Sequence, residues 1–465
     1  MKMIDAGSMA MKWIRRFRLR FSAAAVVALA FFCFGFTTIA LGAFYVSGSS
    51  GNDSNPGTLA APFMTLAKAQ SAMRGSSTTK TTYVKAGTYS IASDFTFSWQ
   101  DAGETWLPYT GPNTVTLDGG GTGYMEANGA TGLAVYGFTI QNLAVSPSGG
   151  GLALNGSNYT VRWNTFLNCF EECISGGDVQ HALIDSNTLN GQSPGNPSGN
   201  TGFFYAAISF WSGSSNNTIS HNLIENTQGA GIVFSTGPTD AAASNNVIDR
   251  NVLENVDTNV VDAGALYIYD AAHNGTGNQI TNNLVFGNDT NSAAITKGIY
   301  LDNLTSNVMV SGNICNKCGT WAVFLHCGDH NTITNNIFDV STLATGSITA
   351  MIAAQDGAGC TSSNGMAGNS FTNNIVYTSG NFPALWWVSN QGGDSLPTDN
   401  TNDYFSATGA AMSNTAVVDT NLQNINPEFT NPSANDYSMS SSSQMHSMIN
   451  FQPLPTDHGP VPYSP

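Results

Sequence analysis

A short polar phrase recurs along most of the chain and restricts the folds that it can adopt. Each copy has an apolar residue, one or more polar residues, an asparagine and another apolar residue, as in "VRWNTF", "ISHNLI" and "ITNNIF". The asparagines of these copies are Asn164, Asn187, Asn222, Asn251, Asn283, Asn313, Asn336 and Asn374. The shortest spacing is 23 residues and longer ones reach 38. A repeating unit of about 23 residues with loop insertions explains this set.

A second short apolar stretch precedes most copies, as in "AISFW", "GIVFS", "ALYIY" and "GIYLD". Two or three short strands per unit, repeated eight times, are typical of a parallel β-solenoid. Asparagine at one turn of each unit would stack coil on coil through its amide. A leucine-rich repeat shares such a ladder, but its regular leucines are absent here. The prediction is an all-β fold, a right-handed parallel β-helix.

The two ends of the predicted helix differ from its middle. Residues 44–130 contain an amphipathic helix near 61–74 followed by the first coils, and a solenoid needs such a cap over its exposed core. Residues 131–400 hold the repeats. Residues 401–465 are turn-rich and form the C-terminal coil end and a tail, for which a course along the outside is one option.

The N-terminal residues 1–43 have the pattern of a secretory signal peptide. A basic run precedes 23 uncharged residues, Phe21 to Ala43, which end in "ALGA". The stretch is also long enough for an uncleaved membrane anchor, which stays open as an alternative. Either reading predicts a secreted or otherwise extracytoplasmic protein that contacts a membrane only through residues 21–43.

Charge and cysteine content narrow the partners and the stabilising bonds. Without residues 1–43 the chain has 8 basic and 29 acidic residues, a formal charge of −21, which argues against binding nucleic acid. Export would allow disulfides. We predict the pairs Cys169–Cys173 and Cys327–Cys360, with Cys315–Cys318 as a further candidate. A zinc site is the weaker reading, because the single CxxC has no second pair.

Aligning the strands that precede the asparagines predicts two outward columns of side chains. Strand side chains alternate, and neighbouring coils are about 4.8 Å apart. One column contains Ser209, Val233, Tyr267, Tyr300 and Phe324, and the other contains Trp211, Ser235, Tyr269, Asp302 and His326. Aromatic rings beside carboxylates suit sugars, whose apolar faces stack on rings while their hydroxyls bond to acids. The alternative is that the rings only stabilise the sheet. We expect Asp302 to be exposed.

The phrases "DAGALYIYD", "ITNNLVFGN" and "GIYLDN" resemble secreted β-helix proteins of the pectate-lyase-like superfamily, over residues 44–430. Within it the chain is most similar to glycoside hydrolase family 141, which includes fucosidases and xylanases. The resemblance implies that Asp262 and Asp302 are the catalytic acid pair. Asn303 stands where the family commonly has a second aspartate, and "HCG" at 326–328 replaces a Gly-Gly turn.

The spacing of the acids leaves their pairing open. A straight strand would place Asp262 roughly 20 Å from Asp302, whereas paired catalytic carboxylates need about 5–10 Å. Either the chain bends at Ala263–Gly264, or Asp270 is the partner of Asp302, with Asp257 as a remoter possibility. The neighbouring acids Glu171 and Glu172 are expected at a solvated corner.

Three functions fit these residues. The first is hydrolysis of a glycosidic bond in a polysaccharide or oligosaccharide by paired aspartates, which needs no cofactor. The second is a polysaccharide lyase or epimerase, which would use a tyrosine or histidine as base and could require Ca²⁺. The third is a non-catalytic glycan-binding or adhesin-like protein. The residues expected to contact the glycan are Tyr267, Tyr269, Tyr300, His326, Trp211, Phe324 and Lys297.

Overall fold

The computed structural model describes residues 42–91, 93–192, 205–260, 262–287, 296–319, 321–341, 350–355, 366–380, 384–389, 397–409, 419 and 421–465. The chain divides into two units, Met1–Gly42 and Ala43–Pro465. The predicted signal peptide or membrane anchor, residues 1–43, lies almost entirely outside the described residues. The predictions of export and of membrane contact through this segment therefore stay predictions. Among the described residues, no helix is both long and apolar enough to cross a membrane.

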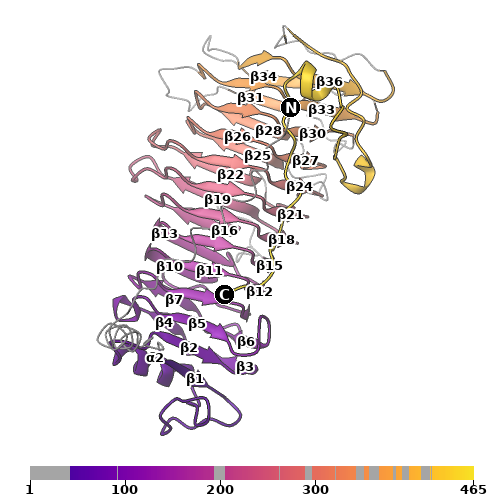
Figure 1. The fold of residues 1–465 in the computed structure, drawn as a ribbon. Helices are drawn as coiled ribbons and strands as arrows, with labels where there is room; N and C mark the ends of the chain where they lie inside the picture. The colour runs from indigo at the N-terminus through magenta and orange to yellow at the C-terminus, as the bar shows by residue number, and fades with distance from the viewer. Residues whose placement is uncertain are drawn as a thin grey trace, which may run out of the picture. The chain divides into compact units, whose positions relative to one another are not determined.

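The unit Ala43–Pro465 is built from three parallel sheets whose strands follow one another in regular rotation (Figure 1). Sheet A consists of β1 (Ala43–Val46), β2 (Thr81–Val84), β5 (Thr105–Pro108), β8 (Ala134–Tyr136), β11 (Thr160–Arg162), β14 (Leu183–Asp185), β17 (Thr218–Ser220), β20 (Val247–Asp249), β23 (Gln279–Thr281), β26 (Met309–Ser311), β29 (Thr332–Thr334), β32 (Ser370–Thr372) and β35 (Thr398–Asn400). Sheet B consists of β3 (Gly87–Ser90), β6 (Val115–Asp118), β9 (Thr139–Gln141), β12 (Thr165–Leu167), β15 (Thr188–Asn190), β18 (Leu223–Glu225), β21 (Val252–Glu254), β24 (Leu284–Phe286), β27 (Ile314–Asn316), β30 (Ile337–Asp339), β33 (Ile375–Thr378) and β36 (Asp403–Ser406).

Sheet C carries the longest strands. It consists of β4 (Phe95–Phe97), β7 (Met125–Asn128), β10 (Leu152–Ser157), β13 (Ile174–Gln180), β16 (Ala206–Trp211), β19 (Ala230–Thr236), β22 (Gly264–Asp270), β25 (Lys297–Asp302), β28 (Trp321–His326), β31 (Ala350–Gln355) and β34 (Ala384–Ser389). Each coil adds one strand to each sheet, which confirms the predicted parallel β-helix. The described helices are α2 (Leu66–Arg74), α3 (Met445–Met448), and the 3-10 turns η1 (Trp99–Asp101) and η2 (Pro432–Ala434).

Helix α2 is the predicted N-terminal cap. Its residues Leu66, Ala69 and Met73 are buried in the same core as the first coils. The helix starts five residues later than predicted, because the Asp53 carboxylate accepts hydrogen bonds from the backbone N–H groups of residues 64 and 65 and holds that segment as a loop. Thr65 then caps the helix by accepting from the Lys68 N–H.

The predicted asparagine ladder is confirmed. Each asparagine of the series accepts a hydrogen bond, at 2.8–3.0 Å, from the backbone N–H of the preceding member, and the series extends one coil further to Asn402. All members are buried. A second, shorter ladder that the sequence analysis missed joins Asn217, Asn246 and Asn278 at another turn. These bonds satisfy backbone groups that no strand partner reaches at the corners.

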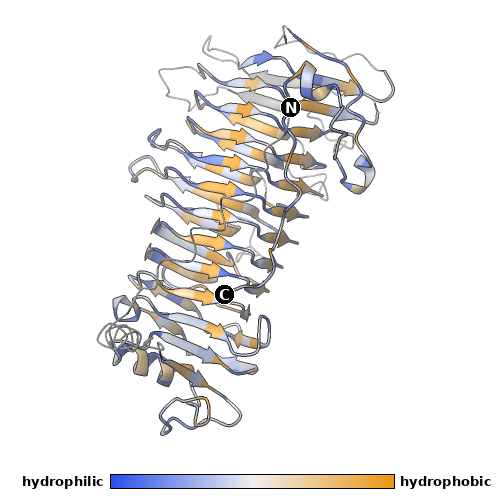
Figure 2. Cartoon of the chain, in the orientation of Figure 1, coloured by the Kyte–Doolittle hydropathy of each residue, from blue (hydrophilic) through white to orange (hydrophobic). Residues whose placement is uncertain are grey.

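The interior of the coils is filled by the apolar residues that strand alternation predicts to point inward. On sheet C these form two columns, such as Ile232, Leu266 and Ile299 in one and Phe234, Ile268 and Leu301 in the other. The strands are accordingly the most hydrophobic part of the fold, and the connecting loops are hydrophilic (Figure 2).

The C-terminal tail runs back along the outside of the coils, so its end lies near β12 (Figure 1). Gln452 is hydrogen-bonded to Asn335, and Asp457 is paired with Arg250. Tyr463 packs on Trp163 with ring centroids 5.1 Å apart. The outside course considered from the sequence is therefore the one that the structure shows.

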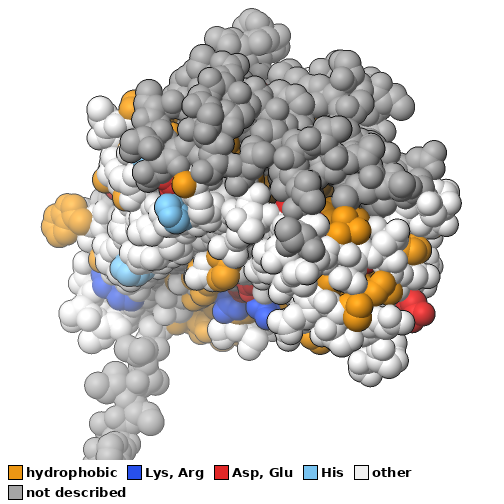
Figure 3. All heavy atoms as spheres, turned by 90° about the horizontal axis from the view of Figure 1, so that it is seen from above, with side chains coloured by type: hydrophobic (Ala, Val, Ile, Leu, Met, Phe, Trp, Pro, Cys, Tyr) orange, Lys and Arg blue, Asp and Glu red, His pale blue; other side chains and the backbone are white. Residues whose placement is uncertain are grey.

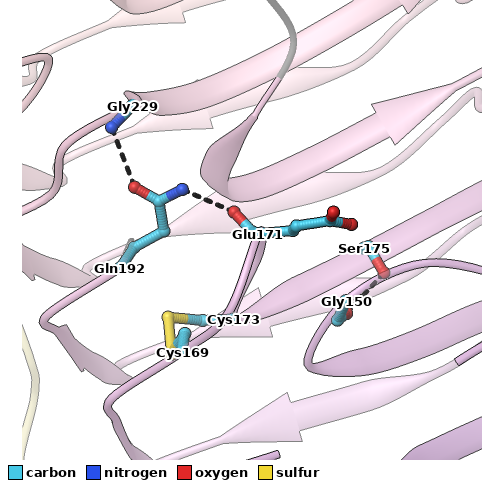
Figure 4. The surroundings of a disulfide bond; sticks show 7 residues. All are labelled: Gly150, Cys169, Glu171, Cys173, Ser175, Gln192 and Gly229. Carbon is cyan, nitrogen blue, oxygen red and sulfur yellow. Dashed lines mark hydrogen bonds between the residues drawn. A yellow bond between two sulfur atoms is a disulfide. The ribbon is translucent and has the colours of Figure 1, made fainter. Parts of the chain in front are cut away.

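Two predicted disulfides are present, Cys169–Cys173 and Cys315–Cys318. The third prediction involves Cys360, which lies outside the described residues. Figure 4 shows the first bond at the turn that precedes β13, where Gln192 donates to the carbonyl of Glu171 and accepts from the N–H of Gly229. The bond and the glutamine together hold this turn against the coils that follow.

Candidate functional site

Strands β22, β25 and β28 lie side by side in sheet C and bring the predicted outward columns into register. Tyr267 pairs with Tyr300, which pairs with Phe324. Tyr269 pairs with Asp302, and Leu301 pairs with Leu325, so Asp302 and His326 are neighbours. The column alignment made from the sequence is confirmed.

The first column is outward but not open. Tyr267, Tyr300 and Phe324 are only 2–3% exposed, and consecutive ring centroids are 4.8 and 4.9 Å apart. They form an apolar cluster separate from the main core, together with Val260 and Ala263 from the segment before β22. The expectation that these three rings offer an open stacking surface is therefore wrong, because that segment packs with them.

Asp302 is the most heavily hydrogen-bonded acid of this region. Its oxygens accept from the Tyr267 hydroxyl at 2.6 Å, the Asn303 backbone N–H at 2.7 Å, and His326, whose Nδ1 lies at 2.6 Å. It is 7% exposed, so the expected exposure is wrong. Burial alone would raise the pKa of Asp302, but the hydrogen bonds from His326 and Tyr267 outweigh it and hold that pKa below its usual value. Asp302 is thus an ionised carboxylate at neutral pH.

Asp262 approaches Asp302 because the chain turns sharply before β22. Asp262 itself has a left-handed backbone, with φ 70°, so the bend lies one residue before the expected position. The Tyr300 hydroxyl is 3.5 Å from Asp262 and also hydrogen-bonds Asp302. A hydroxyl in reach of both acids requires that their nearest oxygens are no more than about 7 Å apart. The Asp262 side chain is 54% exposed, which makes it the accessible acid of the pair.

Lys297 lies beneath Asp262 instead of facing solvent. Its side chain is 1% exposed, its ammonium forms an ion pair with Asp262, and it sits 4.4 Å from the Tyr300 ring centroid. Burial lowers the pKa of Lys297, and the Asp262 charge opposes that effect. Lys297 therefore contacts a site acid and not the space where a ligand would lie.

Asp270 does not join the acid pair. One of its oxygens accepts from the backbone N–H groups of Asn274 and Gly275, at 3.1 and 2.7 Å, and so stabilises the turn after β22. Burial raises its pKa. Side chains alternate along a strand, so Asp270 points to the opposite face from Tyr269. Asp302 pairs with Tyr269, and the Asp270 carboxylate is therefore directed away from that of Asp302.

The accessible aromatic residues lie in the second column. Tyr269 is half-buried beside Asp302. Trp211 is also half-buried, three coils away on β16, or roughly 14 Å along the stack. Its indole lies against Gly149 and Gly177, where an added Cβ would be within 2.8 and 2.6 Å of the ring. Trp211 thus belongs to the same outward column but does not contact the acid pair.

Two further acidic residues, Asp257 and Glu172, are buried. The sequence predicted only a remote role for Asp257 and a solvated position for Glu172. Asp257 is fully buried, and neither of its carboxyl oxygens has a hydrogen-bond partner among the described residues. Burial raises its pKa well above the usual value, although the nearby Lys297 charge opposes the shift.

Glu172 is 6% exposed and not solvated as expected. Burial raises the pKa of Glu172 to about 8, and its carboxyl accepts from the Gly150 N–H. Only the fold could reveal this burial.

A hollow of about 500 Å³ lies between the C-terminal tail and strands β24 and β27. Its walls include Leu284, Ile314, Tyr437 and Met439. These residues form the apolar contact between the tail and sheet B. We therefore place the candidate site at the acidic residues of sheet C, which can take part in acid–base chemistry.

Comparison with known proteins agrees with this architecture. Residues 124–298 match the family model described as the right handed beta helix region. The catalytic domain of a GH87 alpha-1,3-glucanase, as a variant with one aspartate replaced by alanine and in complex with nigerose, is similar in structure, with 14% identity and a TM-score of 0.54, over 82% of this chain and 68% of that one. The PL6 family alginate lyase AlyGC is similar with 13% identity and a TM-score of 0.52, over 91% of this chain and 59% of that one. No curated protein matches the sequence. The chain is therefore a right-handed parallel β-helix protein.

Proposed function

We propose that the protein hydrolyses a glycosidic bond in a polysaccharide or oligosaccharide, with Asp262 and Asp302 as the two catalytic carboxyl groups. The observation that carries this proposal is the Tyr300 hydroxyl within hydrogen-bonding reach of both acids. The upper limit that this sets on the separation of the acids, about 7 Å, is compatible with the spacing of glycosidase acid pairs. The β-helix glucanase that binds nigerose supports a glycan as the substrate class.

The environments of the two acids support different roles. Asp302 is held ionised by its hydrogen bonds and can act as the nucleophile or the base. Asp262 is the exposed acid of the two and is paired with Lys297, so it is the carboxyl group that a bound glycan can contact.

The test is a screen of the purified protein on neutral and acidic glycans, followed by two variants. Asp262→Asn and Asp302→Asn should each lower cleavage by at least about 10²-fold. Asp270→Asn is the matched control and should retain activity. It makes the same chemical change on strand β22, but at an acid that is not one of the two proposed catalytic residues. Full activity in either variant of the pair would overturn the assignment.

A second candidate function is elimination by a polysaccharide lyase, which a separate observation favours. Asp302 lies 2.6 Å from Nδ1 of His326, whose side chain is 25% exposed. A carboxylate that binds Nδ1 leaves Nε2 to accept a proton, as in other Asp-His pairs. The similar alginate lyase has the same fold. An unsaturated product would identify elimination, whereas one oxygen from labelled water would identify hydrolysis. Binding without any cleavage would instead support a glycan-binding protein.

We also propose an extracytoplasmic location. The two described disulfides support it, because disulfides persist mainly in oxidising compartments. The test is fractionation of cells that express the full chain, with and without residues 1–43.

A further inference from the structure

We infer that the site on sheet C selects uncharged glycans over glycans that carry carboxylate groups. This inference rests on the proposed function, since it names the substrate class of the same site. Three observations support it: the positions of the lysines and arginines, the burial of the one lysine at the site, and the groups that are exposed there.

The positive side chains are few and lie away from the site. Residues 44–465 contain eight lysines and arginines, all of them within the part of the chain that the structure describes. Four belong to helix α2 or flank strand β2 at the N-terminal end, and three lie on sheets A and B or their turns. These seven are Lys68, Arg74, Lys80, Lys85, Arg162, Arg250 and Lys317. In the view from above, Lys and Arg side chains appear at only a few places among the described atoms (Figure 3).

The eighth, Lys297, is at the site but cannot bind a ligand carboxylate. Its side chain is 1% exposed, and Asp262 lies over its ammonium as an ion pair. Asp257 and Asp302 are also close enough to act on its charge. The charged atoms that a ligand would meet are therefore those of Asp262, which is 54% exposed and negative in that pair. A uronate placed there would face a carboxylate with no accessible cation to compensate it.

The accessible part of the same surface suits an uncharged sugar chain. Trp211, Ser235 and Tyr269 follow one another in the outward column that leads to Asp302. The two aromatic residues are two coils apart, or roughly 10 Å, and the buried Ser235 lies between them in the column. Rings at this spacing can stack on the apolar faces of sugars along the stack axis without any charged group.

The test compares each polymer with a form of itself that differs only in charge. Polygalacturonate is compared with its fully methyl-esterified form, and alginate with its carboxyl-reduced form, beside neutral glucans and xylans, all at one pH. The uncharged form should be cleaved with at least a tenfold higher kcat/KM at low salt. The difference should shrink as salt screens the repulsion. Equal or faster cleavage of the acidic form overturns the inference.

Binding measurements keep this outcome separate from that of the proposed function. If nothing is cleaved but the uncharged polymers bind better, the proposed hydrolase fails and the selectivity stands. If acidic polymers bind better, or none bind, the selectivity fails as well. Asp262→Asn should narrow the preference measured by binding, because it removes the exposed charge. Asp118→Asn, on sheet B, is the matched control and should leave the preference unchanged.

Discussion

Asn222 lies in the middle of the asparagine ladder, and replacing it with alanine tests what the ladder contributes to stability. Its Oδ1 accepts from the backbone N–H of Asn187 at 2.9 Å, and its Nδ2 donates to the Ile184 carbonyl and to Asn251, both at 2.9 Å. The side chain is fully buried. Because φ at Asn222 is not positive, alanine introduces no backbone strain.

The size of the effect follows from which groups lose their partners. The Asn187 backbone N–H loses the acceptor that it has in the ladder, and a buried unsatisfied donor costs about 1–3 kcal/mol. The Ile184 carbonyl loses one donor, which costs about 1 kcal/mol more. The Asn187 side chain keeps its bond to the Val161 carbonyl. We therefore expect Asn222→Ala to lower the free energy of unfolding by about 2–4 kcal/mol.

Urea unfolding followed by circular dichroism measures this difference. The matched control is Asn128→Ala, an exposed asparagine at the end of β7 and outside the ladder, which should change stability by no more than about 0.5 kcal/mol. If unfolding is irreversible, the unfolding rates at one urea concentration are compared instead. A loss at Asn222 below about 1 kcal/mol, or equal to that at Asn128, would show that the ladder is not a main source of stability.

Three further predictions concern other parts of the molecule. The pKa of Glu172, about 8, exceeds its unfolded value, so its ionisation in the unfolded state lowers stability as pH rises from about 4.5 to about 8, by up to about 1.4 kcal/mol per unit; thermal melts of Glu172→Gln should show a flatter pH dependence, and an unchanged dependence would contradict this. Replacing Cys169 and Cys173 with serine should lower the free energy of unfolding by about 2 kcal/mol, since the closed loop is short, and no loss in urea melts would contradict this. Tyr300→Phe should keep the stacked rings and melting temperature but lower glycan cleavage by at least about tenfold; unchanged kinetics would remove the hydroxyl from the mechanism.

The sequence by itself determined the β-helix and the register of sheet C. The asparagine phrase and strand alternation are local patterns, and stacking of equivalent units turns them directly into neighbours such as Tyr267 and Tyr300. The short Cys169–Cys173 and Cys315–Cys318 pairs follow from local spacing for the same reason. The second ladder is equally local, because Asn217, Asn246 and Asn278 each stand five residues before a member of the first ladder.

Only the tertiary structure decided how the candidate site is covered and which acids meet. Alternation predicts which way Tyr267 and Tyr300 point, but their burial depends on the segment around Val260 and Ala263, which packs with rings of its own coil and of the next two coils. The approach of Asp262 to Tyr300 depends on one left-handed residue, a backbone choice that aspartate permits but does not require. Burial and bends of this kind are set by contacts between distant segments, and no local pattern encodes them.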